Sequence, residues 1–173
     1  MGAWMNQMEW IKELIESENK ILESGIVDSN PEYKKQRLIV KSTLDLLYDL
    51  KAQFTEATQM YNELKPTPQS KIKIYTIAQT HSDFMLFRNG YKMIFTMKEP
   101  GVIEIRFNFI GSQLISSVHA IESKVNSKIF DDQKLQIQVR PFDEVIWTFN
   151  GSEFKVEFLV KFYLNLFVRE SLN

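Results

Sequence analysis

The chain has few side chains whose types and spacing could do chemistry. His81, Ser82 and Asp83 are consecutive, and such a set could form a base beside a carboxylate or supply two metal ligands. Neighbouring residues of one loop rarely converge on one atom, and a zinc ion would need further ligands, so we interpret this segment as loop capping. The other histidine, His119, follows the apolar Val118 in a predicted helix, and we expect it to be a half-exposed structural residue.

The acidic residues give no stronger sign of an active site. Asp131-Asp132 resembles a solvated pair in a turn more than paired carboxylates for general acid and base catalysis. Glu104 and Arg106 lie on the same side of one predicted strand, and we expect a surface ion pair there. The segment Asn150-Gly151-Ser152 matches a glycosylation acceptor, but no export signal accompanies it, and we interpret it as a turn followed by a helix cap.

The motifs of common enzyme classes are also missing. The chain contains no GxGxxG, GxxxxGK[ST], HExxH or GxSxG motif and no EF-hand loop. It has no cysteine, which excludes a disulfide framework, thiol catalysis and thiolate metal sites. We therefore expect no cofactor and no metal, and we favour a protein that is not an enzyme.

Length and charge set further bounds. With 173 residues the chain can form one domain with a sizeable core. Its net charge is -1, so the whole-chain field gives no strong attraction to nucleic acid or to anionic membranes. No apolar run is long enough to span a bilayer, and the first residues lack the pattern of a signal peptide. We expect a cytoplasmic protein without a membrane span.

The first 66 residues are predicted to form a helical hairpin. Its first helix, from about Asn6 to Glu23, has one apolar stripe that consists of Trp4, Met8, Ile11, Ile15 and Leu22. The second helix runs from about Pro31 to Leu64, and its stripe includes Val40, Leu44, Leu47, Leu50, Phe54, Ala57 and Tyr61. The combined apolar surface exceeds what one partner helix can cover. The hairpin therefore packs on the sheet of its own chain, or it associates with a second copy or another protein.

A three-stranded antiparallel meander is predicted from Asp83 to Phe109. Asn89-Gly90 between two apolar runs favours a type I′ turn, which sets Arg88 opposite Tyr91. The resulting apolar pairs are Leu86 with Met93, Phe84 with Phe95, Met97 with Ile103, Phe95 with Ile105 and Met93 with Phe107. A slip of one residue would turn polar side chains inward, so the pattern selects this register.

The remaining elements complete an antiparallel sheet with two helices, in residues 67–173. A short strand at 71–75 precedes the meander, a helix is expected from Ser112 to about Asn126, and two strands follow with Ile137 opposite Trp147, which faces inward. The last segment fits a strand or a helix; the helix explains more residues, with Ser152 as its cap and Phe158 and Phe162 on its buried surface. The predicted fold is α+β in the order αα-ββββ-α-ββ-α, with about six strands and two helices on one face.

The leading hypothesis is a non-enzymatic protein-interaction or adaptor protein that acts as a homodimer or as a subunit of a complex. The predicted partner-binding residues are three on the long helix and three on the open sheet face: Leu47, Phe54, Tyr61, Met85, Phe87 and Ile94. We expect the hairpin, or a partner, to cover the open-face residues Met85, Phe87 and Ile94.

Two alternatives remain open. The open face also carries Lys92, Lys98 and Arg106 beside Phe87, and cations interleaved with an aromatic ring are typical of a single-stranded nucleic-acid platform. The element order α-βββ-α-ββ-α is similar to that of the small secretion chaperones of bacterial pathogens, which implies a dimer that holds an unfolded partner segment. The long hairpin and the additional strand depart from that family's pattern, and the similarity includes no residue motif.

Overall fold

The computed structural model describes residues 2–25, 30–80, 82–109 and 133–172. The chain divides into two compact units, Met1–Lys34 and Lys35–Asn173. The first contains α1 (Gly2–Ser24) and the first turn of α2 (Pro31–Leu64). The second contains the rest of α2, the whole sheet and α4 (Val156–Glu170). Both predicted N-terminal helices are therefore confirmed. The helix α2 has the predicted limits, whereas α1 begins at Gly2, before the predicted start near Asn6.

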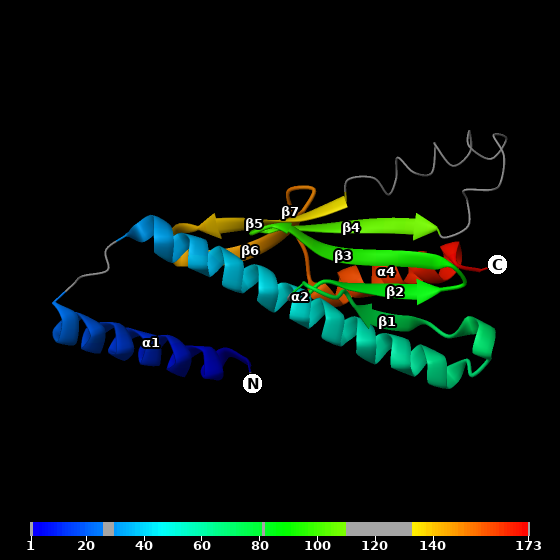
Figure 1. Cartoon of the computed structure of the whole chain (residues 1–173), viewed down its shortest axis with the longest axis horizontal. Helices are drawn as coiled ribbons and strands as arrows, with labels where there is room; N and C mark the ends of the chain where they lie inside the picture. The colour runs from blue at the N-terminus through cyan, green and yellow to red at the C-terminus, as the bar shows by residue number, and fades with distance from the viewer. Residues whose placement is uncertain (1, 26–29, 81, 110–132, 173) are drawn as a thin grey trace. The chain divides into compact units, whose positions relative to one another are not determined.

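The second unit is built on a seven-stranded antiparallel sheet, which confirms the α+β class. The strands lie side by side in chain order (Figure 1). They are β1 (Lys73–Thr76), β2 (Phe84–Arg88), β3 (Tyr91–Glu99), β4 (Val102–Phe109), β5 (Gln133–Arg140), β6 (Glu144–Phe149) and β7 (Ser152–Glu153). None of the described helices is apolar over a stretch that would cross a bilayer. The helix predicted from Ser112 lies outside the described residues.

The register of the sheet is the predicted one. Arg88 pairs with Tyr91 across a turn in which Asn89 and Gly90 have φ values of 50° and 81°, as a type I′ turn requires. The pairs Phe84–Phe95, Leu86–Met93, Met97–Ile103, Phe95–Ile105, Met93–Phe107 and Ile137–Trp147 are all present. The alternation of apolar and polar side chains thus fixes the strand pairing, because a slip would exchange the two faces.

The strand β7 was not predicted, and it corrects the start of the last helix. Asn150 and Gly151 have φ values of 51° and 79° and form a tight turn that returns the chain along β6. Ser152 pairs with Phe149 in this small hairpin, so it is not the helix cap, and α4 begins at Val156. The final segment is nevertheless a helix, as predicted.

The core lies on one face of the sheet, where α2 and α4 both pack. The rings of Phe54 on α2 and Phe95 on β3 are 5.0 Å apart, and Phe95 is 6.1 Å from Tyr163 on α4. Burial raises the pKa of the Tyr163 hydroxyl, which donates a hydrogen bond to Gln133 Oε1. Trp147 is half-buried and packs against the same core, so its predicted inward orientation is confirmed.

The predicted burial of Phe158 and Phe162 is wrong. Their side chains are 62% and 59% exposed, while α4 turns Leu159, Val160, Tyr163 and Phe167 to the core. Each exposed phenylalanine directly precedes a buried residue, and one residue is a rotation of about 100° around a helix axis. A helix that is apolar around most of its circumference therefore still has one face turned away from the sheet.

The turn between β3 and β4 fits closely against α2 and β5. Gly101 has a φ of 87°, and a Cβ atom on it would lie 2.6 Å from Ile137 Cγ2 and 3.2 Å from Ile39 Cγ2. Its N–H donates to the hydroxyl of the buried Thr43 at 2.8 Å, and that hydroxyl donates to the Ile39 carbonyl at 2.7 Å. Both buried groups thus have partners, and α2 is tied to the sheet at this turn.

Candidate interaction surfaces

The predicted partner-binding residues of α2 belong to the protein's own core. Leu47 and Phe54 are fully buried, and Phe54 lies against Phe84 and Phe95. Tyr61 is half-buried, with the guanidinium carbon of Arg88 5.7 Å from the centre of its ring. Leu47 and Phe54 therefore present no surface to a partner, because the sheet already covers the stripe of α2.

The three predicted partner-binding residues of the open sheet face lie on the face opposite the core, unlike those of α2. Met85, Phe87 and Ile94 alternate with the core residues of β2 and β3, so they point away from α2 and α4 and are half-buried. The long helix α2 does not cover them, because it packs on the opposite face of the sheet, and their cover by α1 or by a partner stays a prediction. The ring of Tyr75, which is 43% exposed, lies 6.3 Å from Phe87 and extends this strip to the sheet edge.

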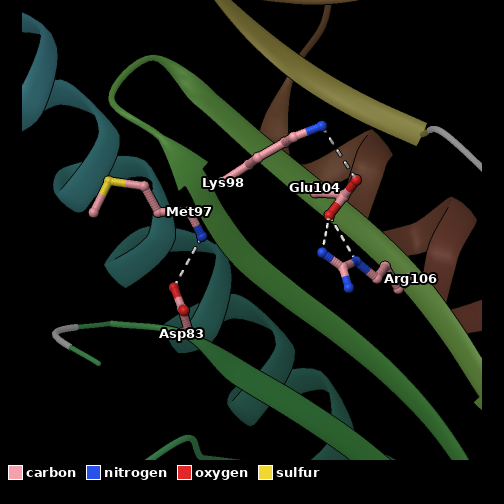
Figure 2. Close-up of polar contacts among 5 residues, drawn as sticks. All are labelled: Asp83, Met97, Lys98, Glu104 and Arg106. Atoms are coloured by element: carbon pink, nitrogen blue, oxygen red, sulfur yellow. Dashed lines mark hydrogen bonds and ion pairs between the residues drawn. The ribbon is translucent and has the colours of Figure 1, made fainter. Parts of the chain in front are cut away.

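Two basic residues of the open face, Lys98 and Arg106, lie beside the buried carboxylate of Glu104 (Figure 2). The Glu104 side chain is only 10% exposed and accepts a hydrogen bond from Arg106 Nε at 2.6 Å. Its other carboxylate oxygen lies 4.0 Å from Lys98 Nζ. The predicted ion pair of Glu104 with Arg106 is confirmed. Of the three cations proposed for phosphate binding, Arg106 is thus paired with an acid and the exposed Lys98 lies near that acid, which lowers the positive potential of this face.

Asp83 has a structural role at the start of β2. Its carboxylate is buried and accepts a hydrogen bond from the backbone N–H of Met97 at 2.9 Å (Figure 2). The strand β2 begins only at Phe84, so the carboxylate takes the place of a strand carbonyl beside the irregular end of β3. This contact confirms loop capping for Asp83, while His81 lies outside the described residues.

The other candidates for chemistry give no site. His119 and Asp131-Asp132 lie outside the described residues, so their predicted roles stay predictions. Within the segments that the structure describes, no three histidine or acidic side chains come together as metal ligands.

A shallow groove separates α2 from the edge strand β1. It has a volume of about 410 Å³ and is lined by Thr55, Thr58, Gln59, Asn62, Glu63, Lys71 and Ile74. The Asn62 side chain accepts from the Ile72 N–H and donates to the Ile72 carbonyl, both at 2.9 Å. Sequence reasoning missed this groove, because residues far apart in the chain form it and no local pattern marks it.

The helix α1 carries an exposed apolar stripe along its described side chains. Its exposed large side chains are Met8, Trp10, Ile11, Leu14, Ile15, Ile21 and Leu22. They recur at helical spacing and lie on adjoining faces of α1. Four residues of the predicted stripe, Met8, Ile11, Ile15 and Leu22, are thus exposed on a helix.

Comparison of this chain with protein-family models, with characterised proteins and with solved structures finds no match.

Proposed function

We propose that the protein is a non-enzymatic interaction or subunit protein, and that α1 supplies its main association surface. The observation that supports this most directly is the exposed stripe of α1, because seven large apolar side chains on one helix favour burial against another surface. The described residues of the first unit, 2–25 and 30–34, include no strand and no second complete helix that could bury them. Our proposal is that a helix or an apolar face of a second protein or copy buries them.

The spacing of the stripe fits helix-to-helix association. Met8, Ile11, Ile15 and Leu22 follow intervals of three, four and seven, which is the repeat of a coiled-coil seam. Beside the seam, α1 has five glutamates and two lysines. An acidic helix of this kind favours a partner with basic flanks.

The chain itself contains a segment with basic flanks. Between Pro31 and Lys41, α2 has four basic residues and one acidic residue. A second copy of the protein therefore carries a segment of the complementary charge, which favours the homodimer form of the proposal.

The nucleic-acid alternative has less support. A single-stranded platform needs cations available for phosphate, and here Arg106 is paired with Glu104, whose carboxylate also lies 4.0 Å from Lys98. The similarity to secretion chaperones stays a prediction, because it depends on element order alone.

Light scattering of the full chain over a range of concentrations tests the association. We expect the purified protein to be a dimer or larger, and we expect Ile11→Glu together with Ile15→Glu to shift it toward monomer. Both isoleucines are exposed, so the sheet unit should keep its unfolding midpoint. A charge placed in a helix seam disrupts pairing, because it would be buried without a partner.

A matched control separates the seam from net charge. Lys12→Gln together with Lys20→Gln also lowers the net charge by two, but both lysines lie on the polar side of α1. The control should leave the dimer intact. A protein that is monomeric at every concentration would contradict the homodimer, and a dimer that both variants keep would contradict the role of α1.

A further inference from the structure

The strand β1 is the terminal strand of the sheet, and its hydrogen-bonding pattern shows which backbone groups face outward. The pair Arg88–Tyr91 closes a two-residue hairpin, so Phe84, Leu86 and Arg88 bond to β3, while Met85 and Phe87 bond to β1. Their partners on β1 are Tyr75, which pairs with Met85, and Lys73, which pairs with Phe87.

The backbone groups of the intervening residues therefore point away from the sheet. Ile77 N–H donates to the Asp83 carbonyl at 2.9 Å, which continues the inward set of odd-numbered residues. Both backbone groups of Ile72 bond to the Asn62 side chain on α2, so Ile72 belongs to the outward set. By the alternation of a β-strand, the N–H and carbonyl of Ile74 and Thr76 also face outward.

The Asn62 side chain shows which kind of group can form hydrogen bonds with the outer edge next to β1. Its amide gives one donor and one acceptor to Ile72, as a peptide unit of an added strand would. Beyond this cap, Ile74 lines the groove between β1 and α2. At the far end of β1, Lys51 Nζ donates a hydrogen bond to the Thr76 hydroxyl at 2.6 Å. This bond joins two side chains and does not involve the backbone groups of Thr76. The free edge is therefore bordered by a helix on one side and accessible along Ile74 and Thr76.

The charged residues around this edge indicate which kind of segment could bind there. The groove lining carries one lysine, Lys71, and one acid, Glu63, and two further lysines, Lys51 on α2 and Lys73 on β1, lie along the edge beside it. Glu63 also accepts a hydrogen bond from Gln59 Nε2 at 3.2 Å. The positive excess would repel β1 of a second copy, since lysines on an edge strand oppose pairing of like edges.

We propose that the groove between β1 and α2 binds an extended acidic peptide segment, which adds a strand to the edge of β1. Main-chain hydrogen bonds to Ile74 and Thr76 supply the binding, and the surrounding lysines supply the preference for acidic side chains. This site lies entirely within the second unit and does not depend on association through α1.

Fluorescence anisotropy of the full chain with three labelled peptides tests the preference. The peptides alternate valine with glutamate, glutamine or lysine over about eight residues, a length within the usual range of strands. We expect the glutamate peptide to bind about tenfold or more tightly than the lysine peptide, and its binding to weaken as salt is raised. Equal affinity for all three peptides, or no binding up to about 1 mM, would overturn the proposal.

A pair of variants locates the site. Lys71→Glu with Lys73→Glu should reverse the order of the glutamate and lysine peptides. The control, Lys155→Glu with Lys161→Glu, makes the same change of charge at two exposed positions, the N-cap of α4 and a residue within it, and should leave the order unchanged. Reversal by the control as well would show a general charge effect and overturn the site.

Amide hydrogen exchange tests the strand addition itself. In the free protein the amides of Lys73 and Tyr75 should be protected more strongly than those of Ile74 and Thr76, and the glutamate peptide should slow exchange at the latter two. Binding without this protection would overturn strand addition. Protection of Ile74 that rises with protein concentration alone would mean that a second copy occupies the edge. The variant with Ile11→Glu and Ile15→Glu should bind the glutamate peptide with unchanged affinity. Peptide binding at β1 can thus be tested separately from association through α1.

Discussion

The helices α1 and α2 have the same kind of sequence pattern and opposite environments. Both have apolar residues at intervals of three and four along one side. In α2 the central residues of the stripe, including Leu47 and Phe54, are fully buried against the sheet. In α1 the corresponding side chains, including Ile11 and Ile15, are exposed.

This contrast separates two meanings of an amphipathic pattern. The pattern shows that a helix has an apolar side, which favours burial somewhere. It does not show which surface covers that side. For α2 the sheet of the same chain is the cover, and for α1 we propose a second protein or copy. Substitutions in the two stripes should therefore change different measured quantities, namely stability for α2 and association for α1.

The largest expected effect is that of Phe54→Ala. Its ring packs against Phe84 and Phe95, so the truncation should lower the free energy of unfolding by about 3–5 kcal/mol, as large core truncations do. Ile15→Ala on α1 should change it by less than about 0.5 kcal/mol. Urea unfolding of both variants at one low protein concentration gives the comparison. Similar losses in both would mean that the stripe of α1 is part of the stability of the same core.

Gly101→Ala tests how closely α2 and β5 approach the turn between β3 and β4. The new Cβ would have to displace Ile137 at a residue with a φ of 87°, so we expect a loss of about 2–4 kcal/mol in the free energy of unfolding. Gly151→Ala is the matched control, since Gly151 has a φ of 79° and open space around it. That variant should lose only about 1–2 kcal/mol. Equal losses would show that backbone conformation alone accounts for the effect.

Thr43→Val tests the polar contact that ties α2 to the same turn. The variant keeps the shape of the side chain and leaves the Gly101 N–H buried without its acceptor, which should cost about 1–3 kcal/mol. Thr55→Val removes a similar hydroxyl, which bonds the Lys51 carbonyl at an exposed position, and should cost less than about 0.5 kcal/mol. Thermal unfolding monitored by circular dichroism measures both. A neutral Thr43→Val would mean that water replaces the lost acceptor.

The smallest effect on stability should come from the outer face of α4. Phe158→Ser with Phe162→Ser removes two exposed rings and should change the free energy of unfolding by less than about 1 kcal/mol, while solubility rises. Leu159→Ala, one residue away and buried, should cost about 2–4 kcal/mol. A large loss from the double variant, measured by urea unfolding, would show that the two rings are covered in solution.

The sequence by itself determined the local elements and the pairing of the strands. Asn89-Gly90 can adopt positive φ at both positions, and this turn, together with the alternation of apolar residues, sets Phe84 opposite Phe95 and Met97 opposite Ile103. The limits of α2 followed from Pro31 at its start and from the prolines after Leu64. These features depend on residues that are close in the chain or on the period of a single element, so the sequence pattern contains them.

Only the tertiary structure decided which surfaces remain exposed. Leu47 and Phe54 became core residues because the sheet faces α2, and the periodicity of α2 contains no information about its partner. The outward position of Phe158 depends on which side of α4 meets the sheet, and the carboxylate of Glu104 is buried by the packing around it. At the groove beside β1, hydrogen bonds connect the Asn62 side chain on α2 to the backbone of Ile72, which directly precedes β1. Such contacts depend on how elements pack in three dimensions, which no spacing along the chain records.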